Sequence, residues 1–440
     1  MASLSRKDTL FIGLMLFALF FGAGNLIFPP FLGQEAGKNF WPAIFGFIIT
    51  GVGLPFVTVI AIALAKDGVK TLGNRVHPVF SLIFATAVYL SIGPFMGIPR
   101  GANVAFEMGI KPFLSDEHLG MELLFFSVLF FALVYWVSLN PSKLVDRIGS
   151  LLTPILLVAI TFLGAGGLMK FNGPLGDATE KYAASPVFTG FMEGYLTMDT
   201  IAALAFGIVV VTSIQSKGVT EQSLVVKAVV KAGLVAGIAL ASVYVAVGLL
   251  GAKMDGNFEN GGAILTTAAE TLYGQFGLML LGLIVMLACF TTCVGLVVAT
   301  SQYFEKLVPR VSYKTLVTVI TIVSFLISNL GLNQIIALSV PILIIIYPIT
   351  IVLVGLSFFH KAFGGFRLVY TGALLCAGII SLFDGLKMFG LEAKMIISLL
   401  EKIPLYSAGL GWLIPALIGG IIGYIGEWIL KRALDKTATN

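Results

Sequence analysis

Long apolar stretches, separated by short polar segments, run along the whole chain. A helix that crosses a bilayer needs roughly 20 consecutive, mostly apolar residues. By this criterion the sequence predicts twelve spans, at residues 8–32, 40–65, 77–108, 120–139, 144–169, 188–213, 221–252, 271–307, 313–331, 333–359, 366–386 and 409–431. A further segment at 390–401 mixes Leu and Ile with Glu and Lys, which fits an amphipathic helix at the membrane interface or an ordinary polar loop. The pattern predicts an all-α, polytopic membrane protein with a single transmembrane domain over residues 1–440.

Composition supports a membrane environment. Of the 440 residues, 58% are hydrophobic and only 11% are charged, whereas soluble domains average about 45–50% and about 25%. The three cysteines all lie in apolar segments and form no Cys/His cluster suited to zinc. No nucleophile–base pair, metal cluster or dense Lys/Arg run is present. We therefore expect neither an enzyme nor a nucleic-acid partner, and the lipid bilayer is the expected surrounding.

The distribution of basic residues predicts topology. Twelve spans put both termini on one side, and most of the 27 Lys and Arg residues fall in the ends and loops of that side. Positively charged loops stay in the cytoplasm. We therefore predict a multi-pass protein of the cell membrane with both termini cytoplasmic.

The spacing of the spans also suggests an internal repeat. Five spans lie within 8–170 and five more within 188–359, followed by two additional helices at 366–431. Because five is odd, the second set must enter the membrane in the opposite orientation. This arithmetic predicts a 5+5 inverted repeat, an arrangement common in secondary transporters.

Polar and flexible residues interrupt the first span. Gly22, Gly24 and Asn25 lie well inside it. Glycine costs about 1 kcal/mol relative to alanine in a helix interior, and unwound backbone at this depth is tolerated only where it lines a protein cavity. We predict a discontinuous helix in which Asn25 caps a second half that begins near Leu26. The alternative is a continuous helix that packs through its glycines.

The sixth span carries a similar interruption. Gly194 offers a flexible point, and Thr197, Asp199 and Thr200 can cap a new helix start. A charged residue at the bilayer centre costs at least about 2.5–3.5 kcal/mol, so Asp199 marks a functional site. Glu193 either joins that site or lies at the membrane interface.

Two half-helices that meet in mid-membrane predict a specific chemistry. A half-helix N-terminus presents free N–H groups and suits a carboxylate. Freed carbonyls and a half-helix C-terminus suit a cation or an ammonium group. The expected walls are Phe, Leu, Ile and Val, so the site suits a zwitterion with an apolar side chain.

Two adjacent hydroxyls, Thr291 and Thr292, form a second polar group in the eighth span. Such hydroxyls often bond back to the i−4 carbonyl of their own helix. The functional alternative is an oxygen cage for a monovalent cation, completed by carbonyls of the first span.

These motifs resemble a known superfamily. Gly22-Ala23-Gly24-Asn25 resembles the Gly-x-Gly-Asn signature of amino acid–polyamine–cation transporters with the LeuT-type fold, and Ala288-x-x-Thr291-Thr292 resembles their eighth-helix cation motif. More narrowly, residues 21–30 and 193–199 resemble the bacterial branched-chain amino acid carriers of the BrnQ type, and this likeness extends over the whole chain.

The resemblance implies symport of leucine, isoleucine and valine, driven by sodium, with discontinuous helices 1 and 6 and no cofactor besides the co-transported ion. The implied sodium ligands are the carbonyls of Ala18, Phe21 and Ala288 and the hydroxyls of Thr291 and Thr292. The implied substrate site comprises Ala23, Gly24, Asn25, Glu193, Gly194, Tyr195, Thr197 and Asp199. Tyr89 in the third span is either a further substrate contact or a packed aromatic residue.

The sequence departs from the family pattern at one point, and three rival functions stay open. Several relatives carry an arginine after the Gly-x-Gly-Asn motif, but here Leu26 follows. Arg100 in the third span either takes that place or lies at the interface. The rivals are proton coupling through Asp199 or Glu193, a channel, and a membrane-embedded enzyme; nothing here resembles a selectivity filter.

Overall fold

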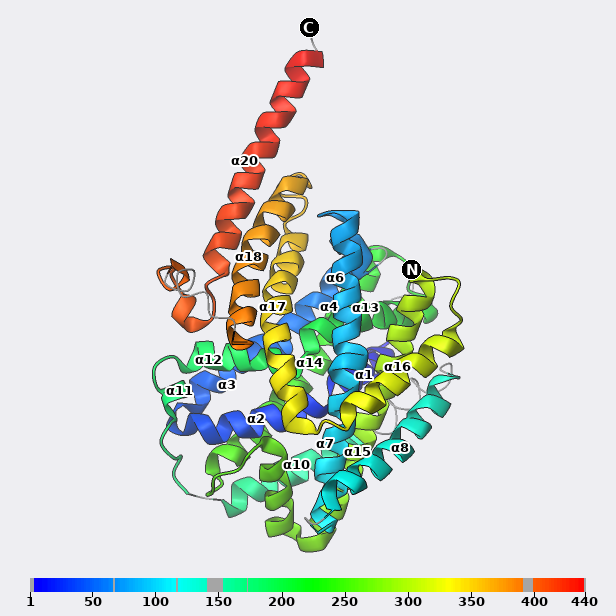
Figure 1. Cartoon of the computed structure of the whole chain (residues 1–440), viewed down its shortest axis with the longest axis vertical. Coiled ribbons are helices and arrows are strands. Elements are labelled where there is room, and N and C mark those ends of the chain that lie inside the picture. Colours follow the sequence, from blue (N-terminus) through cyan, green and yellow to red (C-terminus); the bar gives the residue numbers. More distant parts are fainter. Residues whose placement is uncertain are drawn as a thin grey trace.

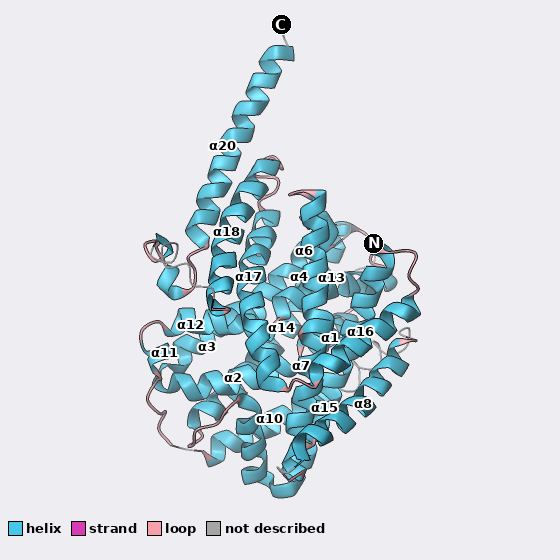
Figure 2. Ribbon diagram, in the orientation of Figure 1, coloured by secondary structure: helices cyan, strands magenta, loops and turns pink. Residues whose placement is uncertain are grey.

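The computed structural model describes residues 4–65, 68–115, 118–140, 153–171, 173–390 and 399–438. These residues form a bundle of helices without strands (Figures 1 and 2). The all-α prediction is therefore confirmed. The predicted start of the fifth span, and most of the 390–401 segment, lie outside the described residues.

Each predicted span corresponds to one helix or to a pair of consecutive helices. The pairs are α1 (Arg6–Phe20) with α2 (Ala23–Ala36), α3 (Phe40–Ile48) with α4 (Leu54–Leu64), α6 (Pro78–Leu90) with α7 (Gly97–Gly109), and α12 (Pro186–Glu193) with α13 (Asp199–Ser216). The single helices are α8 (Leu119–Ser138), α10 (Thr153–Lys170), α14 (Gln222–Lys253), α15 (Gly261–Leu307), α16 (Tyr313–Ser328), α17 (Leu332–Phe358), α18 (Arg367–Met388) and α20 (Leu413–Ala438). Two short helices, α5 (Val69–Asn74) and α11 (Glu180–Ala183), lie in connections.

Within the described ranges, nine helical stretches are long and apolar enough to cross a membrane. One of them, Ala23–Leu64, contains α2, α3 and α4 and so covers two predicted spans. Two further apolar stretches are shorter than these nine, Pro154–Gly167 within α10 and Tyr313–Ser328, which is α16. When Ala23–Leu64 is counted as two spans and the apolar stretches of α10 and α16 are added to the nine, the total equals the twelve predicted spans.

The eighth helix begins earlier than predicted. The sequence predicts a start at residue 271, whereas α15 begins at Gly261 and bends at Gly274, where φ is +60° and ψ is −148°. Glycine adopts this backbone conformation without a steric penalty. The residues before the bend therefore extend the helix in a different direction, which the apolar pattern alone did not reveal.

Two interruptions of the second and third helices were not predicted. A π-helical turn at Ile49–Gly53 separates α3 from α4, and another at Ser91–Phe95 separates α6 from α7. The second contains Pro94, which has no N–H to donate, and Gly93, whose φ and ψ are −83° and −118°. Single π-turns of this kind bend helices and often occur at functional sites.

The helices pack as expected for a 5+5 inverted repeat, in which the first span is equivalent to the sixth, the second to the seventh and the third to the eighth. Helices α1 and α2 pack on α14, while α12 packs on α3 and α13 on α4. The first span therefore packs on the seventh, and the sixth span packs on the second. The third span packs on its own counterpart through α7 and α15.

The last two helices form a separate pair beside this bundle. Helices α18 and α20 pack along each other, and α20 extends past the rest of the chain (Figure 1). A Cβ atom on Gly372 would lie 2.3 Å from the carbonyl oxygen of Gly419. Small residues thus let the two backbones approach closely, as in other membrane helix pairs.

Candidate functional site

Both predicted helix breaks are present. Helix α1 ends at Phe20, and extended backbone at Phe21 (φ −72°, ψ 93°) and Gly22 (φ −129°, ψ −160°) precedes α2. Helix α12 ends at Glu193 and is followed by a 3₁₀ turn at Gly194–Thr197. Met198 then adopts a left-handed conformation with φ +66°, which is uncommon for a residue with a side chain.

The capping role predicted for Asn25 is wrong in detail. Helix α2 begins at Ala23, not near Leu26, and Gly22 is its N-cap residue. Asn25 lies within the first turn, and its Oδ1 accepts a hydrogen bond from the Gly22 N–H at 3.1 Å. The side chain therefore reaches back to the break, and the helix starts three residues earlier than predicted.

The amide of Asn25 joins the two breaks. Its Nδ2 donates to Oδ2 of Asp199 at 2.6 Å and to the hydroxyl of Tyr244 in α14. The Tyr244 hydroxyl also donates to Oδ2 of Asp199, at 3.1 Å. Asn25 is 1% exposed and Asp199 is 3% exposed. The sequence analysis did not select Tyr244, because one tyrosine in an apolar helix carries no local signal.

Arg100 reaches the same region from α7. It is only 4% exposed and lines the space between the breaks. Its Nη1 donates to the carbonyl oxygen of Leu196 at 2.7 Å and its Nη2 to that of Thr197 at 3.3 Å. The guanidinium carbon lies 5.4 Å from the ring centroid of Phe28 in α2. Arg100 thus holds the unwound turn before α13 against the start of α2.

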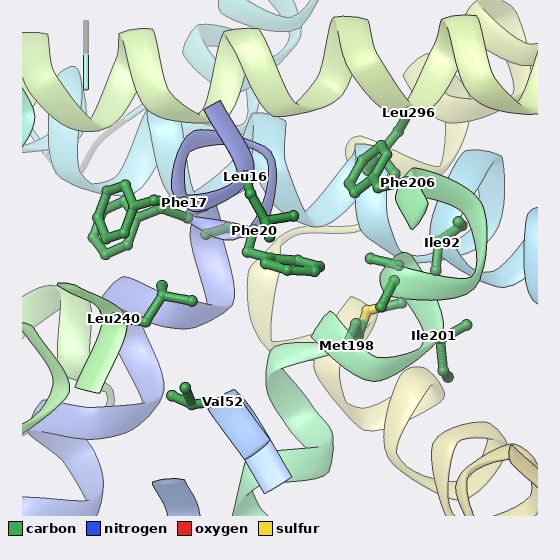
Figure 3. Packing of buried hydrophobic residues seen from close by; sticks show 14 of the residues in the cluster. Leu16, Phe17, Phe20, Val52, Ile92, Met198, Ile201, Phe206, Leu240 and Leu296 are labelled. Carbon is green, nitrogen blue, oxygen red and sulfur yellow. The ribbon is translucent and has the colours of Figure 1, made fainter. Parts of the chain in front are cut away.

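A small cavity of about 40 Å³ lies between the breaks. This volume is far below the range of about 300–1,000 Å³ typical of ligand sites, so a ligand of amino-acid size requires the surrounding helices to move apart. The polar lining residues are Asn25, Arg100, Thr197, Asp199 and Thr292. The apolar lining residues include Phe20, Ile92, Met198, Phe206 and Leu296, which belong to different segments of the chain (Figure 3). The cavity therefore has a charged side and an aliphatic and aromatic side.

The two hydroxyls of the eighth helix have different surroundings. Thr291 donates to the carbonyl of Ala288 at 2.9 Å, a bond to the i−3 carbonyl of its own helix. The hydroxyl of Thr292 is buried and has no hydrogen-bond partner among the described residues. A Cβ atom on Gly22 would lie 3.4 Å from this oxygen. Thr292 therefore faces the break of the first helix, next to Phe21.

Glu193 lies apart from this cavity. Its carboxylate pairs with Lys181 at 2.7 Å, and Lys181 also pairs with Glu35 at 3.0 Å. Burial opposes the positive charge of Lys181, but the two carboxylates outweigh this effect and raise the pKa of the ammonium group. Of the two positions weighed for Glu193, the structure favours the one away from the buried site.

Three further candidate residues are held in packing contacts and do not appear among the residues that line the cavity. A Cβ atom on Gly194 would lie 1.8 Å from the Thr50 hydroxyl. The ring of Tyr195 stacks on Tyr347 at 4.3 Å, and that of Tyr89 stacks on Tyr303 at 4.1 Å. Within the described structure, these residues shape the surroundings of the breaks from outside the cavity.

Glu193→Gln is expected to leave the affinity for leucine, a member of the ligand class that the sequence resemblance implies, within about threefold of the parent protein. The reason is that partly exposed ion pairs contribute only about 0–1 kcal/mol, and this one does not border the cavity. Leucine binding to the purified protein measures the effect. A loss of tenfold or more would place Glu193 in the binding site after all.

Comparison with known proteins gives concordant results. The family model described as "Branched-chain amino acid transport protein" matches residues 5–430. The branched-chain amino acid permeases BraB and BrnQ of Bacillus subtilis are each 47% identical to this chain, with 96% of the chain covered and 96% and 97% of the relatives. The branched-chain amino acid transport system 2 carrier protein of Pseudomonas aeruginosa is 41% identical, with both chains covered completely.

Solved structures share the fold. The inward-facing conformation of Mhp1 superposes with a TM-score of 0.63 at 15% identity, covering 98% of this chain and 95% of that one. MhsT in complex with L-phenylalanine gives 0.54 at 16% identity, covering 96% and 98%. These neighbours confirm the LeuT-type fold with its inverted repeat, and at such identities they carry no information on the ligand.

Proposed function

Because this chain belongs to the family of branched-chain amino acid transport proteins, we propose that it is a sodium-coupled symporter that imports leucine, isoleucine and valine by alternating access. The family and the transport of branched-chain amino acids are established by the full-length matches. The observation that supports sodium as the coupling ion is the Thr292 hydroxyl, which is buried beside the break of the first helix and has no partner among the residues that the structure describes. An unsatisfied buried oxygen is costly, and a cation would satisfy it.

The cavity suits a small aliphatic amino acid. Ala23, Gly24 and Asn25 are the first residues of α2, and the backbone N–H groups at a helix N-terminus favour a carboxylate. Phe206, Leu296 and other apolar residues also line the cavity. The branched aliphatic side chain of the substrate would pack against them and leave contact with water.

Sodium, as a co-substrate, would be held by the carbonyls of Ala18, Phe21 and Ala288 and by the hydroxyls of Thr291 and Thr292. These groups belong to α1, to its break and to α15, so the ion would stabilise the conformation in which the first and eighth helices are close. Coupling then equals the difference in sodium affinity between the two conformations.

The moving parts would be the inverted repeats at 8–170 and 188–359, with the helices at 366–431 outside the exchange and both termini in the cytoplasm. A low sodium concentration in the cytoplasm would release the ion first and free the inner half of the first helix. Leucine would follow into the cell.

One observation favours a second candidate, proton coupling. Asp199 is a buried carboxylate whose side chain accepts hydrogen bonds from the neutral groups of Asn25 and Tyr244, so its protonation would change the charge of the cavity. Glu193 is a weaker candidate because it is paired with Lys181. Leucine uptake into proteoliposomes, with sodium and pH gradients imposed separately, distinguishes the two: uptake that follows the pH gradient and ignores sodium supports the proton.

Thr292→Val is expected to raise the sodium concentration for half-maximal leucine uptake by about tenfold or more. Hydrogen bonds to charged groups contribute about 1.5–3 kcal/mol, and an ion that loses an oxygen ligand loses a comparable amount. Thr291→Val should have a smaller effect, because its hydroxyl already donates to Ala288. Uptake measured over a sodium series gives both values.

The matched control is Thr300→Val, which removes another buried, unpartnered hydroxyl from the same helix. Thr300 faces Gly93 in the third span and not the break of the first helix. The sodium dependence of leucine uptake by Thr300→Val should therefore stay at the parent value. Unchanged sodium dependence in both Thr291→Val and Thr292→Val would refute the proposed ion site.

A further inference from the structure

Two opposite charges border the cavity without touching each other. Arg100 and Asp199 are 4% and 3% exposed, respectively, and both line the cavity. Among the described residues, neither takes part in any of the ion pairs found within 4.0 Å. A buried charge without an opposite charge in contact is expensive. The protein therefore carries two costly groups that it does not use to neutralise each other directly.

The two charged side chains, from α7 and α13, nevertheless lie close together, because each is next to one of two consecutive residues in the first turn of α2. Nη2 of Arg100 would lie 3.0 Å from a Cβ atom on Gly24. The next residue, Asn25, holds Asp199 at 2.6 Å. Consecutive Cα atoms are about 3.8 Å apart. The guanidinium and the carboxylate thus flank one turn of backbone at the position where the helix break opens to the cavity.

Arg100 retains an unused hydrogen-bond donor. Its two terminal nitrogens donate to the carbonyls of Leu196 and Thr197, while its Nε is buried and has no partner among the described residues. Leaving a buried donor unpaired is unfavourable, more so for a charged group. A carboxylate is the acceptor that guanidinium groups bind best.

We propose that Arg100 and Asp199 form a clamp for the charged groups of the substrate. Arg100 binds the α-carboxylate through its free Nε–H, and Asp199 binds the α-ammonium group. The amino acid completes, through its own two charges, the ion pair that the protein leaves open. This inference rests on the proposed transport of branched-chain amino acids, and it assigns recognition of the backbone of the substrate to two side chains in addition to the helix ends.

Charge balance explains the selectivity that such a clamp produces. Arg100 and Asp199 together are neutral, and a zwitterion adds no net charge. An amine without a carboxylate would leave Arg100 unpaired, and an acid without an ammonium group would leave Asp199 unpaired. A site with buried polar groups rejects an analogue that lacks the matching partner far more strongly than it rejects a change in an apolar chain.

The carbonyls of the sixth-helix break are partly occupied, which makes Asp199 the available partner for an ammonium group. Arg100 uses those of Leu196 and Thr197, and the Thr197 hydroxyl uses that of Gly194 at 3.0 Å. Asp199 is the first residue of α13, where the helix dipole favours its negative charge.

The first test uses the unaltered full-length protein, purified in detergent with sodium present. Radiolabelled leucine is displaced by isopentylamine, which is leucine without its carboxylate, and by isocaproate, which is leucine without its ammonium group. Each analogue should bind at least about 100-fold more weakly than leucine. Binding of either analogue as tight as that of leucine would overturn the clamp.

The second test assigns each charge to its residue. Arg100→Gln should weaken leucine binding by about 10- to 100-fold and leave the affinity for isopentylamine nearly unchanged. Asp199→Asn should weaken leucine and isopentylamine and leave isocaproate nearly unchanged. Arg75→Gln is the control, because Arg75 also donates to a backbone carbonyl, that of Ser357, but is absent from the cavity lining.

The outcomes separate the clamp from a purely structural role. If Arg100→Gln weakens all three compounds equally, Arg100 only fastens the helix break and the clamp is refuted. Retained leucine affinity in Arg100→Gln would refute it as well. If that variant does not fold, the analogue series on the parent protein still decides. A parent protein that binds no leucine would refute the proposed function itself.

Discussion

Asn25→Ala should reduce leucine uptake by 100-fold or more. This one side chain accepts a hydrogen bond from the Gly22 N–H and donates to Asp199 and to Tyr244. Alanine would remove all three interactions and leave a buried carboxylate with one hydrogen bond fewer. Each bond to a charged group contributes about 1.5–3 kcal/mol, and each 1.4 kcal/mol corresponds to a factor of ten. Initial uptake rates into proteoliposomes measure the loss.

A second buried asparagine provides the control for Asn25. Asn103 in α7 donates to the carbonyls of Pro99 at 3.0 Å and Ser328 at 2.7 Å, and it is 1% exposed. Asn103→Ala should lower thermal stability, yet keep uptake within a few-fold of the parent value, because the residue does not border the cavity. If both variants lose uptake in proportion to stability, Asn25 has no special role in transport.

Gly251→Ala should destabilise the protein by about 3 kcal/mol, at the upper end of the usual overpacking range of about 1–3 kcal/mol. A Cβ atom at this position of α14 would lie 2.0 Å from the carbonyl oxygen of Pro30 in α2. Because the clash is with backbone, no side-chain rotation relieves it, and the two helices must separate. Thermal unfolding of the purified protein measures the effect.

Gly355→Ala should have the opposite effect and raise the stability of the protein. Gly355 lies inside α17, and a Cβ atom there would meet nothing within 4 Å. Replacing a helical glycine by alanine without a clash removes backbone freedom of the unfolded chain and stabilises by up to about 1 kcal/mol. Equal effects of Gly251→Ala and Gly355→Ala would show that the close approach of α2 and α14 does not contribute to stability.

The close contact between α2 and α14 also bears on transport. Gly251 and Gly33 lie at this contact, and a Cβ atom on Gly33 would come within 1.8 Å of the Gly248 carbonyl oxygen. The second half of the first span, α2, is therefore fixed to the seventh span. Movement of α1 relative to α2 would then occur at the extended residues Phe21 and Gly22, where the Phe21 N–H makes the last bond of α1, to the carbonyl of Phe17 at 2.7 Å, and the Gly22 N–H is bound by the Asn25 side chain.

The positions of the spans and of both helix breaks could be predicted from local sequence. The spans follow from local composition, since lipid requires about 20 apolar residues in succession. The breaks follow from Gly22, Gly24 and Asn25 in one span and from Gly194 to Asp199 in another, where residues of low helix propensity occur at a depth that tolerates no unpaired backbone. Both features depend only on neighbouring residues.

Which polar groups contact one another could be seen only in the folded structure. The partners of Asn25 lie 174 and 219 residues further along the chain, and the carbonyls bound by Arg100 lie almost 100 residues away. Whether Asp199 or Glu193 faces the cavity depends on the depth and rotation of α12 and α13 against their neighbours. These are properties of the packed bundle, because a helix presents every side chain on some face and only the surrounding helices fix which face borders the cavity.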